Sequence, residues 1–155
     1  MKANLQLKEI INRSSKIVFF GGAGVSVPSG IPDFRSSTGL FQEKGEFSPE
    51  EILSRTFFEH YPQKFFRFYK DKMIFPDAKP NRAHYALAKL EEHGKVLGII
   101  TQNIDGLHQE AGSKKVYELH GSIRKNYCMK CLRSYDLQTM LEAEELPHCQ
   151  CGGII

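Results

Sequence analysis

The chain has 155 residues, of which 41% are hydrophobic and 25% are charged, and its formal net charge at pH 7 is +3. This composition is typical of a globular domain with a hydrophobic core and excludes a largely disordered chain. The positive charge comes from dispersed Lys and Arg residues, so direct nucleic-acid binding is not expected. No apolar stretch approaches the roughly 20 residues that span a bilayer, and the N-terminus lacks the apolar core of a signal peptide. We expect a cytoplasmic protein with no membrane partner.

The N-terminal segment MKANLQLKEIINRSSK places its leucines and isoleucines near helical spacing, which predicts an amphipathic helix that covers a sheet.

Three short apolar segments predict three strands. Residues 16–20 (KIVFF) follow, and this run is typical of a strand buried on both faces of a parallel sheet. Residues 95–101 (KVLGIIT) and 115–119 (KVYEL) have the same character and predict two more strands.

The residues between the first two strands are predicted to be mainly helical. Ser48 followed by Pro49 and two glutamates has the pattern of an N-cap with proline at the first helical position. The aromatic residues of 62–75 are interpreted as core packing, with ligand contact as the alternative. A further helix is expected from Asn81 to Gly94. Its apolar positions are Tyr85, Leu87, Ala88 and Leu90. Strands separated by a helical crossover favour an α/β fold with parallel pairing.

The first predicted strand runs into a glycine-rich turn. Gly22, Ala23 and Gly24 supply two close-set glycines, which let backbone amides approach a pyrophosphate. The third glycine of the dinucleotide fingerprint is replaced by Val27, and prolines interrupt the helix that would normally follow. A plain dehydrogenase is therefore disfavoured.

A polar triplet follows this turn. Asp33, Phe34 and Arg35 place an anion, an aromatic ring and a cation beside the glycines. A structural loop is one interpretation, because Gly and Pro are common there. The alternative is a loop that covers a bound nucleotide.

Two further polar clusters follow the second and third strands. Gln102, Asn103 and Asp105 come directly after the second strand, and His120 ends the third. Ligands of a doubly wound sheet lie beyond the carboxyl ends of its strands, so these side chains are expected on the same rim as the glycine turn. Alternatively, Asn103 or Asp105 only caps a helix. Because imidazole titrates near neutrality, His120 could accept a proton from a sugar hydroxyl. The five other histidines show no such placement.

All four cysteines lie in the last part of the chain. Cys128 and Cys131 are separated by two residues, and Cys149 and Cys151 by one. Two such pairs predict a tetrahedral structural zinc site. Two disulfides are the alternative, which an intracellular location disfavours. With four thiolate ligands the metal has no open position, so it should stabilise a small module rather than catalyse.

Taken together, these clusters resemble the sirtuins, the NAD-dependent protein-lysine deacylases. The resemblance rests on GAGVSVPSGIPDFR, TQNIDGLH, YELHGS and the cysteine pairs, and it extends over nearly the whole chain. It implies a partial Rossmann-like, doubly wound parallel sheet with a helical insertion and a small zinc-binding module. The implied division is 1–45 and 80–122 for the first half of the NAD-binding domain, 46–79 for the helical part of the small domain, and 123–155 for a truncated zinc-binding module.

The resemblance also implies NAD as cofactor and acetylated protein lysines as substrate. In the family, the loop after the glycine turn folds over NAD. Asp105 would hold the nicotinamide carboxamide, and Phe34 would shield the reacting sugar carbon from water. The implied cofactor-binding residues are Gly22, Ala23, Gly24, Ser26, Asp33, Phe34, Arg35, Gln102, Asn103, Ile104 and Asp105.

His120 and Asn103 are the catalytic residues that the resemblance implies. The acyl-lysine oxygen would attack the ribose carbon as nicotinamide departs, and His120, matching the family's general base, would help a ribose hydroxyl attack the resulting imidate. Sirtuins that prefer acidic acyl groups carry Tyr and Arg where this chain has Phe66 and Tyr69. Acetyl-lysine is therefore the expected substrate.

The chain ends at CGGII, where a sirtuin core would continue, so we expect a fragment with impaired activity. Its first strand is then expected to leave an apolar sheet edge. Two alternatives stay open: a non-catalytic interaction module built on the zinc knuckle, and a protein ADP-ribosyltransferase that uses the same pocket.

Overall fold

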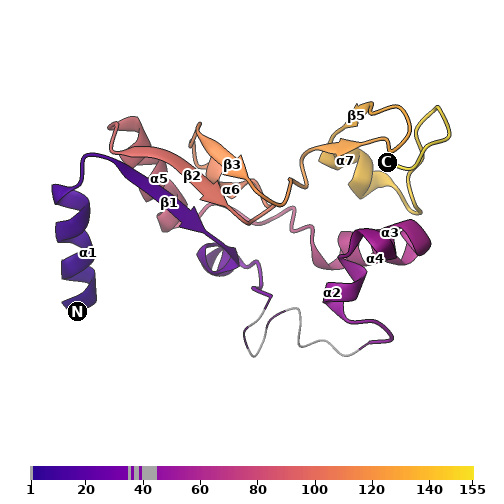
Figure 1. Cartoon of the computed structure of the whole chain (residues 1–155), viewed down its shortest axis with the longest axis horizontal. Coiled ribbons are helices and arrows are strands. Elements are labelled where there is room, and N and C mark those ends of the chain that lie inside the picture. The colour runs from indigo at the N-terminus through magenta and orange to yellow at the C-terminus, as the bar shows by residue number, and fades with distance from the viewer. Residues whose placement is uncertain (1, 35, 37–38, 40–44) are drawn as a thin grey trace.

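A three-stranded parallel sheet lies at the centre of the fold (Figure 1). The computed structural model describes residues 2–34, 36, 39 and 45–155. The strands, in the order β1-β2-β3, are β1 Ile17–Gly21, β2 Val96–Thr101 and β3 Val116–Glu118. The three predicted strands and their parallel pairing are confirmed. No helix in the described part of the chain is long and apolar enough to cross a membrane.

The N-terminal helix α1, Lys2–Arg13, forms as predicted but does not cover the sheet. Leu5, Leu7 and Ile10 are 61%, 57% and 62% exposed. Figure 1 shows α1 projecting away from the strands. Lys95 attaches the end of this helix by donating from Nζ to two of its backbone oxygens at 3.0 and 3.1 Å. The prediction of a covering helix is thus wrong, because the apolar side chains of α1 contact no sheet surface that would bury them.

The sheet is covered on one face. Val18 and Phe20 of β1 are 58% and 61% exposed, and the register places Phe20, Ile100 and Tyr117 on the same face. On the opposite face the Phe19 ring packs against the ring of His108, which belongs to α6, Leu107–Glu110. The prediction that β1 is buried on both faces is therefore wrong, because no described element covers its second face. The expected apolar edge at β1 is observed, since among the described residues β1 pairs only with β2.

Helices separate β1 from β2, and three of them begin with a side-chain cap. The Ser48 side chain and Glu51 form a reciprocal capping box, but the helix ends after four residues, and Ser54 caps the next helix. Asn81 caps the long helix that packs on β2, as predicted. These elements are η1 Ala23–Val25, η2 Val27–Ser29, α2 Pro49–Ile52, α3 Arg55–His60, α4 Pro62–Lys72 and α5 Arg82–Glu92.

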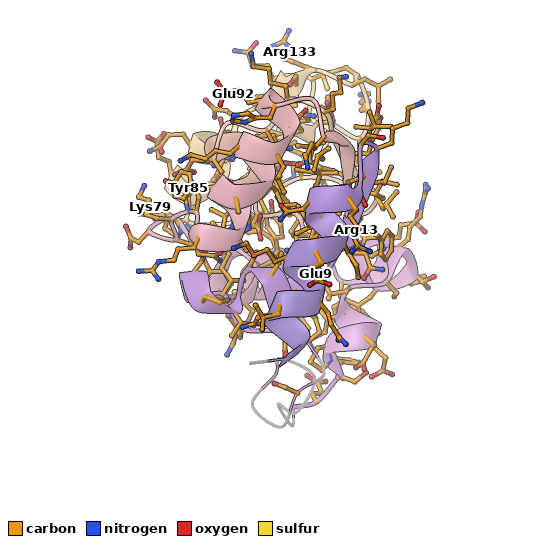
Figure 2. All side chains as sticks on the ribbon, turned by 90° about the vertical axis from the view of Figure 1, so that its left-hand side faces the viewer. Glu9, Arg13, Lys79, Tyr85, Glu92 and Arg133 are labelled. Carbon is orange, nitrogen blue, oxygen red and sulfur yellow. The ribbon has the colours of Figure 1, made fainter. Side chains whose placement is uncertain are left out.

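One predicted apolar position of α5 is wrong. Tyr85 is 49% exposed and lies on the outer surface of the molecule (Figure 2). His84, one position earlier, is fully buried instead. The helix therefore turns its histidine towards the sheet and its tyrosine towards solvent.

The C-terminal segment packs against α4. It contains an antiparallel pair, β4 Asn126–Tyr127 and β5 Ser134–Tyr135, and the helix α7 Leu137–Glu142. Four buried side chains join these parts into one core: Phe66, Ile74, Ile123 and Met140. The helical insertion and the cysteine-bearing segment thus share a hydrophobic core, and the domain boundaries given above stay a prediction.

This shared core predicts the cost of truncating Met140, which is 2% exposed. Met140→Ala should lower the free energy of unfolding by about 2–4 kcal/mol, because it removes a buried side chain and leaves a cavity. Met129→Ala, the same change at a residue that is 54% exposed, should cost well under half as much. Urea unfolding of both variants measures the difference, and equal losses would contradict this core.

Candidate active site

A cavity of about 1190 Å³ opens at the carboxyl ends of the strands and extends along α4. All three polar clusters lie on its wall. The predicted cofactor and catalytic residues that line it are Gly22, Ala23, Gly24, Ser26, Asp33, Phe34, Gln102, Asn103, Ile104, Asp105 and His120. Arg35, also predicted to bind the cofactor, lies outside the described residues. The structure therefore gathers every other predicted cofactor and catalytic residue around one space.

The glycine turn replaces a long helix with two short 3₁₀ helices. Gly22 is extended, with φ −136° and ψ −163°, and η1 and η2 follow in succession. Apart from the chain neighbours of Gly24, no heavy atom of the described residues lies within 4 Å of a Cβ atom built at this position. The backbone at Gly24 therefore faces open space on the cavity wall, which leaves room for a close approach by a ligand.

The buried Ser26 and Asn103 and the half-buried Asp105 form a hydrogen-bonded group, which we call the polar triad. Ser26 Oγ donates to Asp105 Oδ2 at 2.6 Å, and Asn103 Nδ2 donates to Ser26 Oγ at 3.0 Å. Ser26 is fully buried, and Asn103 is 9% exposed. Asp105 Oδ1 accepts the backbone N–H of Leu107 at 2.9 Å, so this carboxylate also caps α6. Asp105 thus fits both interpretations. Its Oδ1 binds the start of α6, and its Oδ2 belongs to the polar triad.

His120 is exposed and is oriented by a backbone oxygen. Its Nδ1 lies 3.1 Å from the carbonyl oxygen of Gln102. A carbonyl can only accept, so Nδ1 must carry the proton in this contact. In the neutral ring the basic lone pair then belongs to Nε2. The residue has the tautomer that a general base at the cavity rim requires.

Two buried histidines behind the polar triad were missed by the sequence analysis. His84 and His108 are 0% and 1% exposed, and their ring centroids lie 4.7 Å apart in an edge-to-face arrangement. Burial, and next the neighbouring His84, lower the pKa of His108 from 6.5 to about 4, while Asp105 opposes this shift. Burial also lowers the pKa of His84. The sequence analysis considered histidines at strand ends, and these two lie in helices, so it gave them no role. The one local signal was the position of His84 three residues after the N-cap of α5.

The aromatic residues of α4 contribute both to the core, as predicted, and to the cavity wall, and ligand contact stays a prediction. Phe66 belongs to the buried core, and Phe65, Phe66 and Tyr69 also line the cavity. The Tyr69 hydroxyl donates to Asn126 Oδ1 at 3.4 Å, and burial raises the pKa of Tyr69 to about 12. Lys72, the last residue of α4, also lines the cavity, so this wall is apolar except for one hydroxyl and one cation.

The four cysteines converge on one point. Their Sγ atoms all lie within 4.8 Å of one another. The Sγ atoms of Cys128 and Cys151 are 3.4 Å apart, and those of Cys131 and Cys149 are 3.6 Å apart. A disulfide needs about 2.05 Å, whereas the edge of a tetrahedron with Zn–S bonds of about 2.3 Å is about 3.8 Å. The backbone N–H of Cys151 lowers the pKa of Cys149 to about 6, which favours a thiolate. The geometry fits a structural zinc ion and excludes two disulfides.

Comparisons with known proteins agree with this arrangement. The Sir2 family profile matches residues 22–155. A protein of Clostridium perfringens named NAD-dependent protein deacetylase is 61% identical over 153 residues, which are 97% of this chain and 63% of that protein. A protein of Clostridium acetobutylicum with the same name is also 61% identical, over 154 residues and with the same two shares.

Solved structures give the same answer. A Sir2 variant described with a deacetylated p53 peptide and 3′-O-acetyl ADP-ribose superposes with a TM-score of 0.85 at 42% identity, over 96% of this chain and 61% of that one. A Sir2 structure described with a p53 peptide and NAD+ gives 0.79 at 44% identity, over 96% and 60%. The chain belongs to the Sir2 family, which confirms the resemblance and the α/β fold class. It spans about 63% of the length of the curated relatives it matches.

The cysteine geometry predicts one zinc ion per chain. Metal analysis of the purified protein should find about one equivalent, and Cys128→Ser should lose most of it. Removal of the metal by a strong chelator should unfold residues 123–155, because the thiolates then have no common partner. A metal-free sample with a fully folded C-terminal segment would contradict this assignment.

The buried histidines predict a loss of stability in acid. His108 has a lower pKa in the folded chain than its ordinary 6.5, so the folded state binds its proton less well. Stability should be unaffected above about pH 6.5 and should fall as the pH drops towards 4, by about 1–2 kcal/mol at pH 5. Urea unfolding at pH 7.5 and pH 5 should show a smaller decrease for His108→Gln than for the unaltered chain. The same decrease in both would show that this imidazole does not titrate in the way described.

Proposed function

We propose that this chain carries the catalytic centre of an NAD-dependent protein-lysine deacetylase. The observation that carries the proposal is the convergence of the glycine turn, the polar triad and His120 on one cavity. The names of the relatives, NAD-dependent protein deacetylase, support it. So do Sir2 structures described with ADP-ribose, with NAD+ and with a p53 peptide.

The residues of the cavity fit an NAD-type dinucleotide. The backbone at Gly24 faces open space and could lie against the diphosphate. Asp105 and Asn103 offer a carboxylate and an amide to the nicotinamide end, and Ser26 fixes their positions. Bound NAD would supply the ribose carbon that becomes bonded to the acyl oxygen as nicotinamide leaves. Asp33 and Phe34 on the cavity wall would exclude water from this carbon.

His120 would act as the general base. Its Nδ1–H is held by the Gln102 oxygen, so Nε2 can take a proton from a sugar hydroxyl while the ring keeps its orientation. The polar triad would hold the nicotinamide carboxamide in the earlier step, up to the departure of nicotinamide. Each role belongs to a described side chain that lies on the cavity wall.

The identities of residues 66 and 69 favour a neutral acyl group. Phe66 and Tyr69 both line the cavity and are uncharged, while the cation of this wall, Lys72, lies at a different position of α4. Where acidic acyl groups are preferred, the family has an arginine in place of Tyr69. A neutral acetyl-lysine is therefore the proposed substrate, presented by a protein.

A nicotinamide-release assay with NAD and an acetylated peptide tests this function. His120→Ala should lower the rate at least about 100-fold, because a general base contributes that much or more. His93→Ala is the matched control, since His93 is also exposed, also directs Nδ1 at a backbone oxygen, at 2.7 Å, and lies outside the cavity. It should leave the rate within about twofold. If neither the unaltered chain nor His120→Ala releases nicotinamide, although both fold with zinc, the non-catalytic module is favoured instead.

A further inference from the structure

Asn81 joins the glycine turn to the start of α5. Its Oδ1 accepts the backbone N–H of Ala83 at 2.9 Å and so caps the helix. Its Nδ2 donates two further hydrogen bonds, to the backbone oxygen of Val25 at 2.8 Å and to Ser29 Oγ at 2.9 Å. These acceptors lie 56 and 52 residues earlier in the chain.

The partners fix the orientation of this amide. A backbone N–H can only donate and a carbonyl oxygen can only accept, so Oδ1 must face Ala83 and Nδ2 must face Val25. Both protons of Nδ2 are then used. The second proton reaches Ser29, the last residue of η2. One half-buried side chain thus holds both 3₁₀ helices of the glycine turn.

The contacts of Asn81 lead to the polar triad by two routes. Val25 directly precedes Ser26, whose hydroxyl binds Asp105. On the other route, the backbone N–H of Asn81 donates to His84 Nδ1 at 3.2 Å, and the His84 ring packs against His108 in the helix that Asp105 caps. The start of α5 is therefore connected to both sides of the Ser26–Asp105 hydrogen bond.

We propose that Asn81 is a positioning residue of the dinucleotide site, which holds the glycine turn at the distance from α5 at which Ser26 meets Asp105. This inference rests on the proposed function for its ligand, and on the contacts above for its geometry. Asn81 is absent from the residues that line the cavity, so it acts through the turn and not by touching a ligand.

The choice of asparagine separates this role from ordinary helix capping. The side chains of Ser48, Ser54 and Asp136 cap other helices of the chain by accepting backbone N–H groups through oxygen. Aspartate or serine at residue 81 would cap α5 about equally well. Neither can donate two hydrogen bonds to the turn. The turn needs the amide nitrogen of Asn81, which donates two hydrogen bonds, whereas the helix needs only the amide oxygen, which accepts one.

Two variants of one residue and a control in the same helix test the proposal. Asn81→Asp keeps the cap but places an oxygen opposite the Val25 carbonyl, and Asn81→Ser keeps the cap but loses the reach. Ala86→Gly, at an exposed position of α5, weakens the helix without touching the turn. Hydrogen exchange of the Val25, Ser26 and Ser29 amides should accelerate about tenfold or more in both Asn81 variants and stay within about twofold in Ala86→Gly.

The second measurement is affinity for ADP-ribose by calorimetry. Loss of the two hydrogen bonds should weaken binding about tenfold in the Asn81 variants, whereas Ala86→Gly should bind within about twofold of the unaltered chain. Unchanged exchange in the turn would overturn the proposal, and so would faster exchange with unchanged affinity. If the unaltered chain binds no ADP-ribose, the proposed function fails, and the exchange result alone decides whether Asn81 holds the turn.

Discussion

The hydrogen bond from Ser26 Oγ to Asp105 Oδ2, 2.6 Å long, joins two loops that are 79 residues apart in sequence. One loop follows β1 and the other follows β2. The contact therefore fixes the distance between the glycine turn and the polar residues that follow β2. Ser26 is fully buried and also accepts the amide of Asn103. Without its hydroxyl, a half-buried carboxylate oxygen and the buried Asn103 amide would lose a partner, and the buried amide alone would cost about 1–3 kcal/mol. The Ser26 hydroxyl therefore stabilises the observed arrangement of the two loops.

The parallel sheet brings His120 to the same end of the strands as these two loops. Gly21 pairs with Thr101, and Thr101 pairs with Glu118, so the three strands end at nearly the same level. The ladder continues one step beyond the strands, because Gln102 N donates to Gly21 O at 3.0 Å. The carbonyl oxygen of Gln102 in turn accepts a hydrogen bond from Nδ1 of His120. His120, the proposed general base, is thus oriented by the same backbone segment that carries Asn103 and Asp105, the residues proposed to hold nicotinamide.

Much of this arrangement could be predicted because its signals are local. The apolar run at 16–20, the N-cap at Asn81 and the cysteine pairs each depend on neighbouring residues, and all three are present in the structure. Burial depends on distant partners, and there the prediction failed. The sequence pattern of α1 indicates an apolar face but not what covers it, and its leucines are exposed. His84 and His108 meet only in three dimensions, so no spacing rule could pair them.

If the glycine turn and the polar triad form one binding surface, they should respond as one in an NMR titration of the isotopically labelled chain with ADP-ribose. The backbone amides of Ala23, Gly24, Asn103 and Asp105 should then shift together along a single saturating curve. Shifts confined to the cysteine-bearing segment, or saturation of the two loops at different concentrations, would contradict a single binding surface.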